Sequence, residues 1–69
     1  MEQILSNYVN GNLKEARQQA RRFSKNKIRD YILEMGYILE MADALAEYLK
    51  GEIEFQTLCD IEYTLGALN

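Results

Sequence analysis

Apolar residues recur every three or four positions along most of the chain, which is the spacing of one face of an α-helix. Strict alternation of apolar and polar residues never persists, and proline is absent. The pattern therefore predicts an all-α fold without strands. The expected helices cover residues 2–9, 13–23, 25–35, 38–50 and 54–68.

The residues between these segments are typical of helix ends. Gly11 and Gly51 suit the left-handed position that follows a helix, and Asn12 is placed to cap the second helix. Ser24 is a favourable N-cap for the third helix, although the second and third helices can also run together, because serine is tolerated inside helices. Gly36 then marks a break before the fourth helix.

Each expected helix has an apolar stripe, and together the stripes predict one shared core. The residues expected on them are Ile4, Leu5, Tyr8, Leu13, Ala16, Ala20, Phe23, Ile28, Tyr31, Ile32, Met35, Ile38, Met41, Ala42, Leu45, Tyr48, Leu49, Leu58, Ile61, Leu65 and Leu68. The two small alanines of the second helix predict a close approach to a neighbouring helix. Tyr63 and Leu33 lie off the stripes and are candidates for exposed apolar contacts.

With 69 residues, the chain is expected to form a single domain, residues 1–69, as a compact bundle of four or five short helices. A chain of this size buries only roughly 60% of its unfolded surface, so a monomer is marginally stable. Cys59 is the only cysteine, which excludes a disulfide within the chain. A homodimer, in which the first and last helices complete a neighbour's core, is therefore an alternative to a monomeric bundle.

Charge is strongly segregated along the sequence. Residues 14–29 hold seven of the eight basic residues against one acid, Glu15, for a net charge of +6. Residues 30–69 hold nine acids and one base, Lys50, for a net charge of −8, and the whole chain carries −3. Random placement rarely produces this asymmetry, which indicates a role in folding or in binding.

The basic residues of the second helix and its C-terminal side form what we call the basic ridge. Its members are Lys14, Arg17, Arg21, Arg22 and Lys25. One interpretation is that the ridge binds an anionic partner, either an acidic protein surface or nucleic acid. The other is that it pairs with the acidic fourth helix, within the chain or across a dimer. The leading hypothesis is a non-catalytic protein–protein interaction or regulatory role, and the alternative is a small nucleic-acid-binding protein.

The expected fourth helix carries an acidic ridge, Glu40, Asp43 and Glu47. If the third and fourth helices bound DNA as a helix-turn-helix, these carboxylates would face the phosphates and be repelled. The negative net charge also weakens attraction to nucleic acid. The acidic ridge is either a solvated helix face or, together with Glu52, Glu54 and Asp60, a mimic of nucleic-acid phosphates that occupies a basic groove of a partner.

The sequence offers little material for catalysis, so we expect no enzyme, no cofactor and no small-molecule substrate. Histidine is absent, which excludes a Ser-His-Asp triad, and isolated glycines form no phosphate-binding loop. One thiol without histidines makes a zinc site improbable. A lone cysteine and the lack of a signal-peptide pattern predict a cytoplasmic location, and no apolar stretch is long enough to span a membrane.

The run Ile28-x-x-x-Ile32-x-x-Met35-Gly36-Tyr37, followed by Ala42, Leu45 and Ala46, resembles the start of a ubiquitin-associated domain. The resemblance covers about 40 residues from Ile28 onward. It implies a three-helix fold in this part of the chain. It also implies that a loop of Met35, Gly36 and Tyr37 contacts ubiquitin.

The chain also resembles the small helical proteins encoded by phages and prophages. The similar segments are Tyr8-Val9-Asn10-Gly11-Asn12 with Ala16-Arg17, and Tyr48-Leu49-Lys50-Gly51 leading to Phe55. This resemblance implies a protein that acts by binding a host factor.

Overall fold

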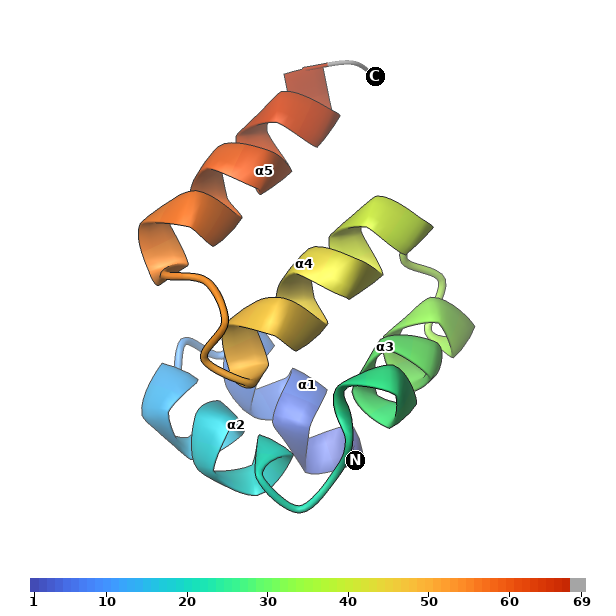
Figure 1. Ribbon diagram of the computed structural model, residues 1–69, viewed down its shortest axis with the longest axis vertical. Helices are drawn as coiled ribbons and strands as arrows, with labels where there is room; N and C mark the ends of the chain where they lie inside the picture. Colours follow the sequence, from blue (N-terminus) through green and yellow to red (C-terminus); the bar gives the residue numbers. More distant parts are fainter. Residues whose placement is uncertain (68–69) are drawn as a thin grey trace.

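The computed structural model describes residues 1–67 and places them in five short helices (Figure 1). The helices are α1 (Glu2–Val9), α2 (Leu13–Ala20), α3 (Lys25–Glu34), α4 (Leu39–Leu49) and α5 (Phe55–Ala67). Within residues 1–67 there is no strand. The predicted all-α bundle of short helices is therefore confirmed.

Helix α4 lies at the centre of the fold (Figure 1). It packs against α3 on one side and α5 on the other, and the α1–α2 pair closes the core beneath it. Helix α5 returns alongside α4 and contacts mainly that helix. Because α4 is surrounded on several sides, most of its side chains are buried, whereas the other helices keep broad exposed faces.

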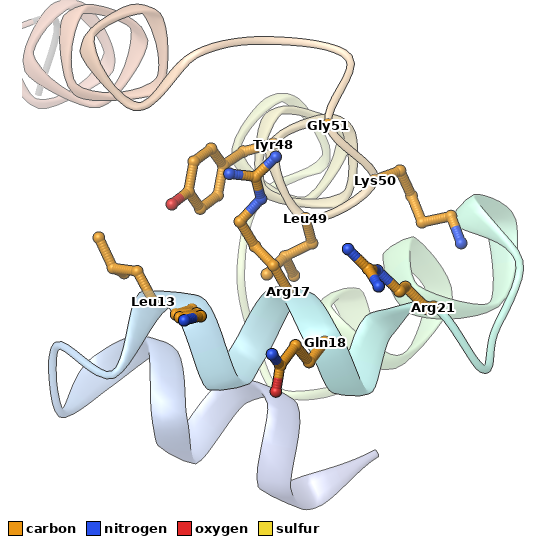
Figure 2. Close-up of a pocket in the computed structure, with 9 residues that line it drawn as sticks. Leu13, Arg17, Gln18, Arg21, Tyr48, Leu49, Lys50 and Gly51 are labelled. Carbon is orange, nitrogen blue, oxygen red and sulfur yellow. The ribbon is translucent and has the colours of Figure 1, made fainter.

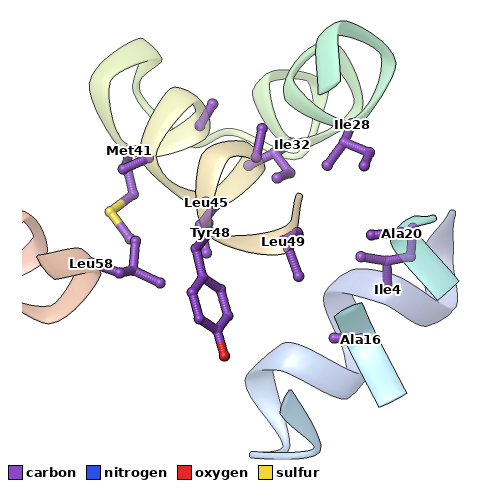
Figure 3. Close-up of a cluster of buried hydrophobic side chains, with 13 residues drawn as sticks. Ile4, Ala16, Ala20, Ile28, Ile32, Met41, Leu45, Tyr48, Leu49 and Leu58 are labelled. Carbon is purple, nitrogen blue, oxygen red and sulfur yellow. The ribbon is translucent and has the colours of Figure 1, made fainter. Parts of the chain in front are cut away.

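The core is a single apolar cluster to which every helix contributes (Figure 3). Its largest fully buried side chains are Ile28, Ile32, Leu45 and Leu58. The predicted close approach at the two alanines of α2 is confirmed, because Ala16 and Ala20 are both 0% exposed. Their small side chains let the α2 backbone come near α1 and α4.

Three expected positions differ in the structure. Met35 and Ile38, expected in the core, are 53% and 52% exposed. They flank the break at Gly36, where the chain leaves helical geometry, so the helical spacing no longer places them on the core face. Leu33, expected at the surface, is partly buried against the core, because α3 packs along α4. Leu68, the last residue of the expected stripe, lies outside the described residues.

The glycine after α4 ends that helix as predicted. Gly51 has a φ of +79°, a conformation that glycine adopts without strain. Its amide donates to the carbonyl of Tyr48, and the Glu52 amide donates to the carbonyl of Glu47 at 2.8 Å. These are the two hydrogen bonds of a Schellman motif, which satisfies carbonyls that the helix leaves without partners. The same pair of bonds follows α1 at Gly11.

Ser24 separates α2 from α3, so the two helices are not continuous. Ser24 is extended, and its Oγ accepts a hydrogen bond from the Lys27 amide at 3.3 Å. Between Ala20 and Ser24 the backbone makes tighter turns, with amides bonded to the carbonyl three residues before. Asn12, by contrast, does not cap α2 with its side chain, which lies instead 3.5 Å from the Asn7 Oδ1 atom.

The helices described here range from 8 to 13 residues. Among residues 1–67, no helix combines the length and apolar character needed to cross a bilayer.

Candidate functional site

The basic ridge borders a groove between α2 and the C-terminal end of α4 (Figure 2). Three of its members, Lys14, Arg17 and Arg21, line the groove, because positions spaced by three and four residues share one face of a helix. Arg17 and Arg21 both extend from α2 toward α4 in Figure 2. Their alignment is thus a direct result of the sequence spacing.

We call this hollow of about 440 Å³ the basic groove. Its lining residues are Leu13, Lys14, Arg17, Gln18, Arg21, Tyr48, Leu49, Lys50 and Gly51. No carboxylate lines it in the part of the chain that the structure describes. Four cationic side chains therefore share one concave surface, and an anion bound there would relieve their mutual repulsion.

Arg17 forms the boundary of the basic groove on the side of α5. Its guanidinium carbon lies 5.3 Å from the centre of the Tyr48 ring, a cation–π arrangement. The Tyr48 ring is almost fully buried and packs against the Phe55 ring at a centroid distance of 5.6 Å. Arg17 is thus held over the Tyr48 ring and keeps its charge at the surface.

Lys50, the one basic residue of the acidic half, also faces this groove. Its Nζ donates to the carbonyl oxygens of Ala20 and Phe23, at 3.3 and 2.9 Å. These carbonyls belong to the last turn of α2 and the connection that follows, where a cation is favoured. The side chain therefore ties α4 to α2 and adds positive charge to the groove.

The other two members of the basic ridge lie elsewhere. Arg22 borders a small hollow on the α1 side, with Gln19 and Phe23, since it is rotated by about 100° from Arg21 around the helix axis. Lys25 pairs with Glu52, with 2.9 Å between Nζ and the carboxylate. This hydrogen bond and the charge of Glu52 raise the pKa of Lys25 above its usual value.

Two basic side chains form ion pairs with carboxylates of the same chain, which is the arrangement that the alternative interpretation of the charge segregation predicts. Besides Lys25 with Glu52, Arg29 lies 3.2 Å from Asp30 and 3.8 Å from Asp43. These ion pairs join residues of the basic segment to α3, α4 and the α4–α5 connection. In contrast, Lys14, Arg17, Arg21, Arg22 and Lys27 make no ion pair within residues 1–67.

The acidic ridge does not form one uniform surface. Asp43 faces Arg29, whereas Glu40 is exposed in the first turn of α4, where a negative charge is favoured by the helix dipole. Glu47 is partly buried near the end of the same helix. Within residues 1–67, no group of three carboxylate or thiol side chains gathers closely enough to hold a metal ion.

A second hollow, of about 640 Å³, adjoins the basic groove and shares Arg17, Tyr48 and Gly51 with it. We call it the apolar hollow after its two apolar side chains outside the core, the exposed Phe55 and the partly buried Ile53. Its remaining lining residues are Glu52, Glu54 and Thr57. Sequence reasoning missed Ile53 and Phe55 as site residues, since only the fold of the α4–α5 connection brings them beside α2.

The other expected contact residues lie away from these hollows. Tyr63 is 80% exposed on α5, as expected for a residue off the apolar stripe. Met35, in the segment that resembles a ubiquitin-associated loop, is also exposed, whereas Tyr37 is partly buried against the core.

Comparison of the chain with protein-family models, with curated proteins and with solved structures gave no match.

Proposed function

We propose that this protein is a non-catalytic interaction or regulatory protein that binds an acidic segment of a protein partner in the basic groove. The proposal rests on the position of Lys14, Arg17 and Arg21 and on their lack of carboxylate partners in the described residues. They line one concave surface without an ion pair in the described residues, while Lys25 and Arg29, two of the four basic residues outside the groove, pair with carboxylates. Folding thus leaves this part of the ridge available to an external anion.

A different protein fits the basic groove better than a second copy of this chain. Contact between the basic groove of one copy and the acidic helices of another would join two different surfaces. Such head-to-tail contacts build open chains unless their rotation closes a ring. A separate partner with an acidic segment would pair with the positive charge of the basic groove without building such chains.

Nucleic acid is the second candidate, because the same cations would contact phosphates. The net charge of −3 disfavours it, as do Glu52 and Glu54 beside the groove. Salt dependence alone does not separate the two candidates, since both involve ion pairing. Direct competition between an acidic peptide and an oligonucleotide does.

The test measures binding of a fluorescein-labelled hexaglutamate peptide and of a labelled single-stranded oligothymidylate by anisotropy. We expect the peptide to bind more tightly and Arg21→Glu to weaken it about tenfold or more, without a change in melting temperature. Lys27→Glu is the matched control, because it makes the same charge change at an exposed lysine outside the groove. Equal effects of the two variants would contradict the proposal, and tighter oligothymidylate binding would favour nucleic acid.

A further inference from the structure

The basic groove and the apolar hollow form one continuous surface with two chemical halves. Arg17, Tyr48 and Gly51 line both, so the two hollows meet at the Arg17 side chain stacked on Tyr48. The first half presents Lys14 and Arg21. The second presents Ile53 and Phe55, from the α4–α5 connection and the first turn of α5, beside the polar residues Glu52, Glu54 and Thr57.

The apolar half contains a large aromatic side chain at the surface. Phe55 is 44% exposed although its ring packs against Tyr48, and Ile53 beside it is partly buried against the core. Large aromatic rings that are held in place by packing on one side and exposed on the other are frequent anchors in protein interfaces. Holding Phe55 against Tyr48 reduces the entropy that it would lose on binding.

The charge along this surface changes from one half to the other. Positive charge is concentrated at Lys14 and Arg21, whereas the apolar half is bordered by Glu52 and Glu54. Glu52 is already engaged by Lys25. A ligand with evenly spaced negative charges would meet the Glu54 carboxylate in the second half, but a ligand that is anionic at one end and apolar at the other fits both halves.

From this juxtaposition we propose that the surface binds a peptide in which an acidic run is followed by a large apolar side chain. The carboxylates lie at Lys14 and Arg21, and the apolar side chain covers Ile53 and Phe55 next to the Arg17–Tyr48 stack. This inference rests on the proposed function, since it uses the same basic groove. It adds the requirement for an apolar residue in the partner segment.

The experiment compares two labelled peptides on the unaltered protein. One has three glutamates, a glycine, a tryptophan and a leucine, and in the other two serines replace the tryptophan and leucine. We expect the apolar version to bind about tenfold more tightly, a difference of about 1.4 kcal/mol. Because the ligand is varied and the protein is not, a folding defect does not affect this comparison.

Three variants then locate the effect. Phe55→Ala removes the preference for the apolar peptide, and Tyr63→Ala, which truncates an exposed aromatic side chain on the same helix outside the hollow, preserves it. Arg21→Glu weakens both peptides. A labelled oligothymidylate is measured beside them as the nucleic-acid probe.

The outcomes separate the two proposals. If both peptides bind equally and Arg21→Glu weakens both, the acidic-partner function stands and the two-part surface is refuted. If Arg21→Glu affects neither peptide, both proposals fail. If the oligothymidylate binds more tightly than either peptide, both give way to nucleic-acid binding.

Discussion

Lys50 and Phe23, which are 27 residues apart in sequence, are joined by a hydrogen bond of 2.9 Å from the lysine Nζ to the phenylalanine carbonyl oxygen. A second bond from the same Nζ reaches Ala20. The lysine therefore serves as the cap of a helix that is distant in sequence. It fixes the position of α2 relative to α4, and with it the shape of the basic groove.

Replacing this lysine with methionine removes both charge-assisted hydrogen bonds and keeps most of the apolar stem. We expect Lys50→Met to lower the free energy of unfolding by about 1–3 kcal/mol, measured by urea denaturation. Lys27→Met is the control, because Lys27 is exposed and its side chain makes no hydrogen bond in the described residues. Equal urea midpoints for Lys50→Met and Lys27→Met would show that the Lys50 hydrogen bonds contribute no stability.

Helix α5 is expected to be the least stable part of the fold. It contacts mainly α4, and Leu58 is the one fully buried side chain among its residues 55–66. Leu58→Ala creates a cavity, a change that costs about 2–5 kcal/mol in well-packed cores. Hydrogen exchange should show faster opening of α5 amides, while amides near Ile28 and Leu45 remain protected.

A control on the same helix separates the loss of buried packing from the effect of truncating any side chain of α5. Tyr63→Ala truncates an exposed side chain and should change stability by no more than about 0.5 kcal/mol. If Leu58→Ala speeds exchange uniformly along the chain, α5 does not open separately from the rest of the fold.

The contact of α2 with its neighbours depends on small side chains. Ala20 is fully buried, so Ala20→Leu inserts three carbons where no space exists and should cost about 1–3 kcal/mol or more by thermal or urea denaturation. Gln18→Leu introduces the same side chain at an exposed position of the same helix and is expected to be nearly neutral. Similar losses for both would mean that α2 does not pack closely.

Tyr8 makes stability depend on pH in the alkaline range. Burial, followed by the nearby Glu62 carboxylate, raises its pKa from 10.0 to about 12. The unfolded chain therefore loses this proton more readily than the folded chain, and the stability present below pH 10 falls as the pH rises from about 10 to 12.

The measurement compares Tyr8→Phe with the unaltered protein from pH 9 to 12. The loss assigned to Tyr8 is about 1–2 kcal/mol, after allowance for its partial exposure, and it should be absent from the variant. Tyr63→Phe is the control on an exposed ring. Parallel stability curves for Tyr8→Phe and the unaltered protein would contradict this assignment.

The helices and most of the core were predictable because both depend on local spacing. Apolar residues at helical intervals placed Ile28, Ile32 and Leu45 correctly, and glycine or serine marked helix ends such as those at Gly51 and Ser24. Prediction failed at Met35 and Ile38, where the chain leaves the helix and the periodicity no longer determines which way a side chain points.

The candidate site was only partly predictable. The alignment of Lys14, Arg17 and Arg21 follows from their spacing on one helix. Nothing in the spacing indicated that Lys25 would pair with Glu52, or that Phe55 would lie beside Tyr48. These contacts depend on how the α4–α5 connection folds back toward α2, and such long-range contacts leave no periodic signal.

The helical character of the chain, most of its helix ends and the division of its charges between two halves can be read from the residue order, because these properties depend on residues close together in the chain. Which charges pair with one another and which remain in the groove follows from the packing of the helices. That division depends on distances of a few ångströms between separate helices. For this reason Lys25 is paired with a carboxylate, while Arg21, four residues earlier, faces the basic groove.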